Sequence, residues 1–229
     1  MKNLLLFGAL YFSVCAVYAQ QTVNRRNRLT SSVVEKYQSL IEANKEVRQG
    51  NYQAFYKKDV LIANGHYTNN QRTGKWTFYN NDGKAIELFD YDKNLLLDEA
   101  AEDSTSNFRY VFDGNINKTD RMTKPLKIGG RYYGYLPFLK AFKIPSDLSG
   151  ITRRDYTVIL EILVSPGGML ADFKIHLNSR YYQRLIPVDI DRMPDDARKF
   201  LPATQNGQPI ASRIFISCYL DDGDDIDIE

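Results

Sequence analysis

Residues 65–84, GHYTNNQRTGKWTFYNNDGK, place glycines, aromatic residues and Asn or Asp at short intervals with almost no aliphatic residue between them. Within this stretch, KWTFY (75–79) alternates polar and aromatic side chains, which is typical of a β-strand with one buried face. Asp82-Gly83 follows closely and favours a tight hairpin turn, because both central residues of a type I′ turn need positive φ. The pattern predicts a strand over 75–79, a turn, and a partner strand over 85–90.

The Gly-x-Tyr motif occurs twice, at Gly50-Asn51-Tyr52 and at Gly65-His66-Tyr67, with the copies fifteen residues apart. Repeated hairpins of this kind predict an up-and-down antiparallel β-meander of similar units. In such a sheet the glycines relax the backbone at the hairpin ends and the aromatic rings cover the faces. We therefore interpret the stretch as architecture whose side chains need no ligand.

The second copy resembles a MORN-type repeat, which runs from Gly-x-Tyr through a polar turn and Gly-x-Trp-x-x-Tyr to a closing Asn/Asp-Gly. The residues that match are Gly65, Tyr67, Asn69, Gly74, Lys75, Trp76, Phe78, Tyr79 and Gly83. The upstream copy matches in part, since it lacks the Trp and the closing Gly. The resemblance covers roughly residues 47–92 and is similar in particular to the repeats of bacterial antitoxin-like secreted proteins. It implies a protein-interaction or structural meander without catalytic residues.

The sequence of segment 31–47 is compatible with either of two secondary structures, a helix or a strand. Its apolar residues fall at helical spacing, and Ser31 or Ser32 is available as a cap, so the pattern alone favours an amphipathic helix. These apolar residues are Val33, Val34, Tyr37, Leu40 and Ile41. The position directly before a run of hairpins favours a first strand instead, and a strand is our expectation.

The first residues, 1–19, join a basic start at Lys2 to an apolar run and end in Val-Tyr-Ala, which predicts a secretory signal cut after Ala19. The run is shorter than the ~20 residues of a membrane-spanning helix. Lipidation at Cys15 is disfavoured because Val14 precedes it, and an uncleaved anchor stays open as an alternative. We expect export across the inner membrane, to the periplasm or in association with the outer membrane.

Composition limits the possible functions and the possible covalent links. The formal net charge is only +2, and the basic residues are scattered, which disfavours a nucleic-acid groove. With 229 residues, of which 43% are hydrophobic, we expect two small domains. Once the signal is removed Cys218 is the single cysteine, so no internal disulfide can form, and its apolar surroundings in the sequence predict a buried, inert thiol.

The middle of the chain, 93–124, has little apolar periodicity. It contains the acidic run 98–103 and the polar run 113–124, with FRYVF (108–112) between them as one short strand. We expect a linker that carries one strand and marks the boundary between a repeat region over 20–92 and a second domain over 125–220.

The second domain begins with a glycine pair and a short helix that starts near Tyr135, accepts Pro137 in its first turn and stops before Pro145. Residues 156–164 are apolar on both faces, which predicts a central strand. After a turn, MLADFKIHL (169–177) alternates apolar and polar side chains, which predicts a strand with one buried face.

Residues 180–203 predict another short helix, with Pro194 in its first turn, and 210–220 predict the last strand. The fold class expected for the whole chain is α+β. It combines an N-terminal antiparallel β-meander of hairpin repeats with a C-terminal three-stranded antiparallel sheet that has helices on one face.

The second domain resembles the C-terminal domain of TonB-type energy transducers over about 125–220. The motifs are Gly129-Gly130 before a helix that ends in Ile144-Pro145, the Leu201-Pro202-Ala203 segment, the Asn206-Gly207-Gln208-Pro209 turn, and the final strand RIFISCYL. The long Pro-rich spacer of such transducers is missing, which puts coupling to an inner-membrane motor in doubt. In that family the edge of the last strand receives a short segment of outer-membrane receptors, and the resemblance implies the same here.

Nothing in the sequence predicts a catalytic or metal site, or a cofactor. His66 and His176 fall in different domains without partners at ligand spacing, and we expect both to be exposed. Asp195-Asp196 is explained as charge at a helix start. The closing residues, 221–229, predict a solvated acidic tail.

What remains is binding by strand addition, in which an extended peptide pairs with the unpaired backbone of the last strand. The candidate residues are Arg213, Ile214, Phe215, Ile216, Ser217, Cys218 and Tyr219. Arg213 and Ser217 are expected on one face, and the apolar residues Ile214, Ile216 and Cys218 on the other. The partner would be a protein, such as a receptor segment, and neither a nucleic acid nor a small-molecule substrate. Three alternatives stay open: an edge covered by the N-terminal hairpins or the tail, a scaffold without peptide binding, and an unrecognised hydrolase or transferase.

Overall fold

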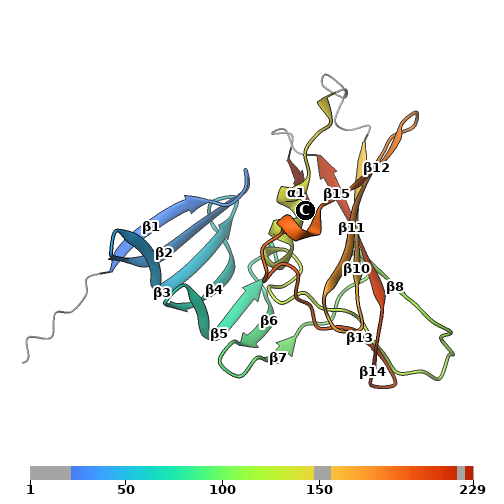
Figure 1. The fold of residues 1–229 in the computed structure, drawn as a ribbon, viewed down its shortest axis with the longest axis horizontal. Helices are drawn as coiled ribbons and strands as arrows, with labels where there is room; N and C mark the ends of the chain where they lie inside the picture. The colour runs from blue at the N-terminus through green and yellow to red at the C-terminus, as the bar shows by residue number, and fades with distance from the viewer. Residues whose placement is uncertain (1–21, 147–155, 221–224, 229) are drawn as a thin grey trace, which may run out of the picture.

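A computed structural model of the protein describes residues 22–146, 156–220 and 225–228. Two antiparallel sheets stand side by side, with the chain segment that carries helix α1 between them (Figure 1). The structure is therefore mostly antiparallel sheet with little helix. The predicted signal, 1–19, lies outside the described residues. Among the described residues, no helix has the length and apolar character needed to cross a membrane.

The N-terminal half is a seven-stranded antiparallel meander in which the strands follow one another in chain order. Its strands are β1 (Val23–Arg28), β2 (Val33–Glu42), β3 (Lys45–Tyr56), β4 (Val60–Thr68), β5 (Gln71–Tyr79), β6 (Ala85–Asp90) and β7 (Leu95–Glu99). The strand expected over 75–79 forms the end of β5, and its predicted partner over 85–90 is β6. The preference for a strand over a helix in 31–47 is confirmed, since this segment supplies β2 and the start of β3.

A register shift explains why β2 has helical spacing in its sequence. The pairing of β2 with β3 shifts between Tyr37 and Ser39. Before the shift Val33 and Glu35 are buried, and after it Ser39 and Leu40 are buried. Such a shift moves the buried positions out of strict alternation. The apolar residues therefore fall three and four positions apart without forming a helix.

Gly65 has a different role from the one we expected. It lies inside β4, away from a hairpin end, and it is opposite Tyr52 in β3. A Cβ atom at this position would lie 2.1 Å from an indole carbon of Trp76. Glycine is therefore required because the Trp76 ring lies directly on the backbone of β4, and Trp76 itself is fully buried.

The two Gly-x-Tyr motifs pair with each other across β3 and β4. Gly50 is opposite Tyr67, and Tyr52 is opposite Gly65, so each tyrosine faces the glycine of the other motif. The two tyrosine rings meet edge to face, with their centroids 5.3 Å apart. This pairing accounts for the sequence motif, whereas the MORN-type resemblance stays a prediction.

The C-terminal half is built on a six-stranded sheet in place of the three strands expected. Its main order is β12-β11-β10-β15, and both β8 and β16 pair with the far side of β15. These strands are β8 (Phe108–Phe112), β10 (Thr157–Val164), β11 (Leu170–Asn178), β12 (Gln183–Pro187), β15 (Ser212–Leu220) and β16 (Ile226–Asp227). The three expected strands are present, and β10 is central as predicted. Three further strands extend the sheet.

The expected alternation of β11 holds over most of its length. Phe173, Ile175 and Leu177 are buried, but so is Leu170, whereas Met169 is exposed. The pairing with β10 shifts in register near Val164 and reverses the facing at the start of β11.

The segment 93–124 is not the linker that we expected. Its parts join three different sheets, because β7 completes the meander, β8 pairs with β15, and β9 (Met122–Thr123) pairs with β13 (Ala203–Gln205). A third, three-stranded sheet contains β9, β13 and β14 (Gln208–Ile210).

The first predicted helix is present and the second is not. A 3-10 turn, η1 (Tyr133–Tyr135), leads into α1 (Leu136–Ala141), with Pro137 in its first turn. In the second region only a 3-10 turn, η4 (Ile190–Arg192), forms before Pro194. The backbone after Pro194 is drawn into extended pairing, since Leu170 N donates to Arg198 O and Phe200 N donates to Gly168 O. That pairing excludes a longer helix.

The acidic tail was expected to be solvated, but its described part belongs to the sheet. Ile226 and Ile228 are buried, and residues of β16 pair with Tyr219 and Leu220 of β15. Asp227 between these two isoleucines is buried as well, so the high charge of the tail did not indicate its burial.

One continuous core joins the two halves through the connecting segment, which we define as residues 129–142. Tyr133 of this segment stacks on Phe78 of the meander, with ring centroids 5.7 Å apart. Phe138 meets Phe173 of β11 edge to face at 5.2 Å. The two separate cores that the chain length suggested are therefore fused into one.

A buried carboxylate also ties the halves together. Glu87 of β6 is 3% exposed and accepts hydrogen bonds from the backbone N–H groups of Gly129, at 2.8 Å, and Gly130, at 3.0 Å. Burial is the largest influence on this group and raises the pKa of Glu87 to about 7, against the opposing effect of the two hydrogen bonds.

This pKa predicts an unusual dependence of stability on pH. The folded protein holds the Glu87 proton to higher pH than the unfolded chain, so this group makes the free energy of unfolding decrease as pH rises from about 4.5 to about 7. The expected difference is at most about 3 kcal/mol. Urea unfolding of the wild type and of Glu87→Gln across this range measures it. A stability difference between the two proteins that stays constant with pH would refute the assignment.

Candidate functional site

The strand predicted to bind a partner is paired on both sides. β10 pairs with β15 from Ser212 to Cys218, and on the opposite side β8 pairs with Ser212–Ile216 and β16 with Tyr219 and Leu220. The prediction of a free edge here is therefore wrong, and the alternative in which the tail covers the edge describes part of the cover. The affected residues are Arg213, Ile214, Phe215, Ile216, Ser217, Cys218 and Tyr219.

The predicted faces of this strand are nevertheless confirmed. Ile214, Ile216 and Cys218 are buried, whereas Arg213 and Ser217 lie on the more open face. Cys218 is a free, buried cysteine, and burial raises the pKa of its thiol well above the ordinary value. This setting fits an inert thiol.

The other residues weighed from the sequence lie apart from one another. His66 is exposed on β4, and Asn51 is its neighbour at 3.4 Å. His176 is only partly exposed, because its Nε2 lies 2.6 Å from the carboxylate of Glu161 on the open face of the C-terminal sheet. No group of three or more His, Cys, Asp or Glu side chains that suits a metal ion occurs among the described residues.

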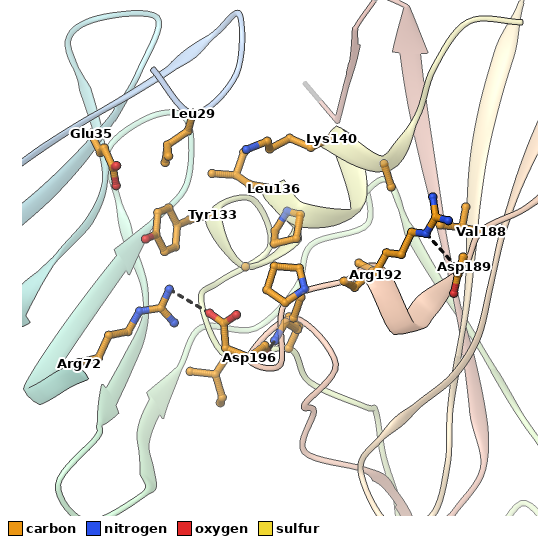
Figure 2. Close-up of a pocket in the computed structure, with 18 of the residues that line it drawn as sticks. Leu29, Glu35, Arg72, Tyr133, Leu136, Lys140, Val188, Asp189, Arg192 and Asp196 are labelled. Atoms are coloured by element: carbon orange, nitrogen blue, oxygen red, sulfur yellow. Dashed lines mark hydrogen bonds and ion pairs between the residues drawn. The ribbon is translucent and has the colours of Figure 1, made fainter. Parts of the chain in front are cut away.

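A cleft of about 920 Å³ lies between the meander and the C-terminal half. Figure 2 shows Glu35, Arg72 and Tyr133 on one side of it and Val188, Asp189 and Arg192 on the other. Its volume is in the range of ligand-binding sites, and it is the candidate functional site.

Four strands of the meander supply one wall of the cleft. The residues are Glu35 from β2, Arg48 and Tyr52 from β3, Tyr67 from β4 and Arg72 from β5. Glu35 is 1% exposed, and its carboxylate lies 2.7 Å from Nη2 of Arg48 and accepts a second hydrogen bond from Asn27. This buried pair satisfies the charge of Arg48 within the protein.

Arg72 is held differently from Arg48. Its guanidinium group lies over Trp76, 5.1 Å from the ring centroid, and donates to the hydroxyl groups of Tyr91, at 3.1 Å, and Tyr67, at 3.4 Å. Within the described residues it forms an ion pair with the carboxylate of Asp196, at 3.5 Å. Asp196 comes from the opposite wall, and its side chain is 62% exposed.

Two tyrosines form a polar link on the floor of the cleft. Tyr133 donates a hydrogen bond to the hydroxyl oxygen of Tyr52, at 2.8 Å. Burial raises the pKa of Tyr133 to about 12, so its hydroxyl stays protonated at neutral pH. The cleft therefore presents neutral aromatic hydroxyl groups beside the two arginines.

The opposite wall comes from Lys127, α1 and the chain after β11. Lys127, which is 5% exposed, donates to the backbone carbonyls of Asp196, at 2.5 Å, and Lys199, at 2.9 Å. Burial lowers the pKa of Lys127 to about 8, a value at which the amine is still mostly charged at neutral pH. Lys127 thus fixes the turn that carries Asp196 across from Arg72.

Strand β12 forms one border of the cleft, and it is the last strand of its sheet. Val188 N donates to Phe173 O, and Ser179 N donates to Tyr182 O. Since inward- and outward-facing residues alternate along an antiparallel edge, Arg184 and Ile186 face β11, and Gln183 and Leu185 turn their N–H groups outward. Among the described residues, no strand pairs with this outer rim, so the unpaired edge that we expected on β15 occurs on β12 instead.

The lining of the cleft is rich in charged side chains. It contains five cationic side chains and three carboxylates, so its net charge is positive. Among the described residues, the lining contains no Ser, Thr, Cys or His. The arrangement can hold an anionic group by charge and by hydrogen bonds from arginine and tyrosine.

The sequence analysis missed this cleft, although a signal was present. Arg72 is in phase with Trp76 on β5, Arg48 is in phase with Tyr52 on β3, and Glu35 is in phase with Val33 on β2. Charged residues therefore occupy positions that period-two alternation assigns to the buried face. Such breaks in an otherwise consistent pattern are typical of functional or strained sites.

Comparison of the chain with protein-family models, with curated proteins and with solved structures found no match. The assignment of the cleft as the candidate site therefore rests on the geometry of the structure. The TonB-type and MORN-type resemblances stay predictions.

Proposed function

We propose that this protein is an exported, non-catalytic protein-interaction module that captures an extended segment of a partner protein. The segment adds to the outer rim of β12 as a further strand and lies along the cleft. The observation that carries the proposal is that the outer edge of β12, with which none of the described strands pairs, borders a large, positively charged cleft. Strand addition uses main-chain hydrogen bonds for affinity and adjacent pockets for specificity.

The geometry of β12 supports this mode of binding. Ile186 is opposite Ile175, a buried residue of β11, so Ile186 faces the core side of the sheet, and it also lines the cleft. In an added strand, every second side chain points to that same side. Backbone pairing at β12 would therefore direct alternate side chains of the partner into the cleft.

Two features limit where the partner can pair. Pro187 has no N–H group and turns its nitrogen to the outer side, which ends the rim on that side. Leu185, which is 52% exposed, offers its N–H group at the centre of the rim. The resemblance to TonB-type domains favours an outer-membrane receptor segment as the partner, with the binding edge moved from β15 to β12.

Proline substitution at Leu185 tests the proposal. The purified protein is used to select binders from a displayed library of random twelve-residue peptides, and their dissociation constants are measured by calorimetry. Leu185→Pro removes an outward N–H group without touching the bonds to β11, so we expect at least a tenfold loss of affinity. Leu185→Ala, which keeps the N–H group, should bind as the wild type does.

Thermal unfolding of both variants shows that the fold is kept. The proposal fails if no peptide is enriched, or if the proline variant binds enriched peptides as tightly as the alanine variant does. Those results would favour the scaffold alternative.

A further inference from the structure

Asp196 faces Arg72 across the cleft. It is an exposed carboxylate on a turn of the C-terminal half, and it extends to the arginine of the opposite wall, where Oδ2 lies 3.5 Å from Nη2 of Arg72 (Figure 2). We propose that the cleft recognises a carboxylate of an acidic peptide segment through Arg72, and that Asp196 is an internal competitor for this site. The inference rests on the proposed function and names the chemistry of the captured segment.

The guanidinium group of Arg72 is preorganised for such a ligand. Its guanidinium plane is fixed by Trp76 and by the hydroxyl groups of Tyr67 and Tyr91, so its orientation is set before any ligand arrives. A guanidinium group held in this way binds carboxylates with less loss of side-chain entropy than a free one.

The contrast with Arg48 supports the choice of Arg72. Arg48 has a buried carboxylate partner at 2.7 Å, and replacing Glu35 by a ligand would leave Glu35 buried without its cation. Arg72 has a longer contact to a carboxylate that is mostly in water, and Asp196 can return to water at little cost. A ligand carboxylate therefore competes with Asp196 far more easily than with Glu35.

The charge of the cleft agrees with an acidic ligand. Lys140 and Arg192 add exposed cations to the lining, of which Arg192 is paired with Asp189 at 3.1 Å, and Lys127 adds a buried cation that donates to two backbone carbonyls. Their field favours the approach of a negatively charged segment. A basic or neutral segment would gain nothing from this arrangement.

Trp76 provides the readout, because it is the only tryptophan in the chain and its ring lies against Arg72. Its fluorescence is titrated with hexapeptides of alternating Val and Thr in three forms. The first has a central Glu with both ends blocked, the second has Gln in its place, and the third has Gln with a free C-terminal carboxylate. The first and third forms distinguish a side-chain carboxylate from a terminal one.

We expect one of the two carboxylate peptides to bind at least tenfold more tightly than the blocked Gln peptide. Arg72→Met should abolish this preference, whereas Asp196→Asn should tighten binding of the carboxylate peptide several-fold by removing the internal competitor. Lys75→Gln is the matched control, since Lys75 is an exposed cation on the other face of the same strand, and its loss should leave the preference unchanged.

Equal binding of all three peptides would overturn the proposal, as would a carboxylate preference that survives in Arg72→Met, or weaker binding in Asp196→Asn. The outcome for the proposed function is separate. A carboxylate preference that Leu185→Pro does not weaken would retain the carboxylate site and reject strand addition. If binding of the library peptides is weakened by Leu185→Pro but the peptides show no carboxylate preference, strand addition is retained and the carboxylate site is rejected.

Discussion

Replacing Glu87 with alanine is expected to lower the free energy of unfolding by about 2–6 kcal/mol. The substitution leaves the N–H groups of Gly129 and Gly130 buried without an acceptor, and each such group costs about 1–3 kcal/mol. These bonds join β6 to the connecting segment, so their loss also loosens the contact between the two halves. Urea unfolding followed by Trp76 fluorescence measures the effect.

The controls for this experiment lie close by. Asp98 of β7 is an exposed carboxylate on the neighbouring strand, and Asp98→Ala should change stability by less than about 0.5 kcal/mol. Glu87→Gln keeps one acceptor oxygen and should lose less than Glu87→Ala. A loss below about 1 kcal/mol in Glu87→Ala would mean that the two glycine N–H groups find other partners.

Replacing Gly65 with alanine is expected to cost about 3 kcal/mol, since the new methyl group would overlap the Trp76 indole. The ring is fully buried and packs on Tyr52 and Tyr67, so it has nowhere to move. Chemical denaturation gives the stability of the variant. Gly74→Ala is the comparison, because a Cβ there meets nothing within 4 Å and pays only about 1–2 kcal/mol for its left-handed backbone.

A double-mutant cycle isolates the contact itself. Trp76→Phe shortens the ring, so Gly65→Ala should cost at least about 1 kcal/mol less in that background than in the wild type. Additive effects of the two substitutions would show that the glycine is required for a reason other than the indole.

Local signals in the sequence predicted most strands. The alternation and turn residues over 75–90 and the apolar run over 156–164 led to the correct elements, because both patterns reflect interactions between near neighbours in the chain. The error at Pro194 has the opposite origin. A helix start is a local signal, and here pairing of residues 198–200 with 168–170 overrides it.

Strand partners distant in sequence were beyond the reach of the sequence patterns. The short strand at 108–112 was recognised, but its position beside β15 depends on the packing of the whole C-terminal half. The prediction of an unpaired edge on β15 was wrong for the same reason. One strand cannot show from its own residues whether a neighbour covers it, and here β8 and β16 do so together.

The cleft was predictable only in part. The charges at Glu35, Arg48 and Arg72 were visible as exceptions to strand alternation, but only the folded chain brings strands β2, β3 and β5 together with Asp196. The glycine and aromatic stretch that we interpreted as pure architecture thus supplies two residues, Tyr67 and Arg72, that line the cleft.

The two sheets differ in the sequence separation of their paired strands. From this difference we expect an order of assembly. Each strand of the meander pairs with the next along the chain, so its loops are short and their closure entropy is small. The other sheet needs residues 108–112 to meet 212–216. Contacts between distant residues form slowly. The meander can therefore form early and offer Trp76, Phe78 and Tyr52 as a template on which the later half condenses.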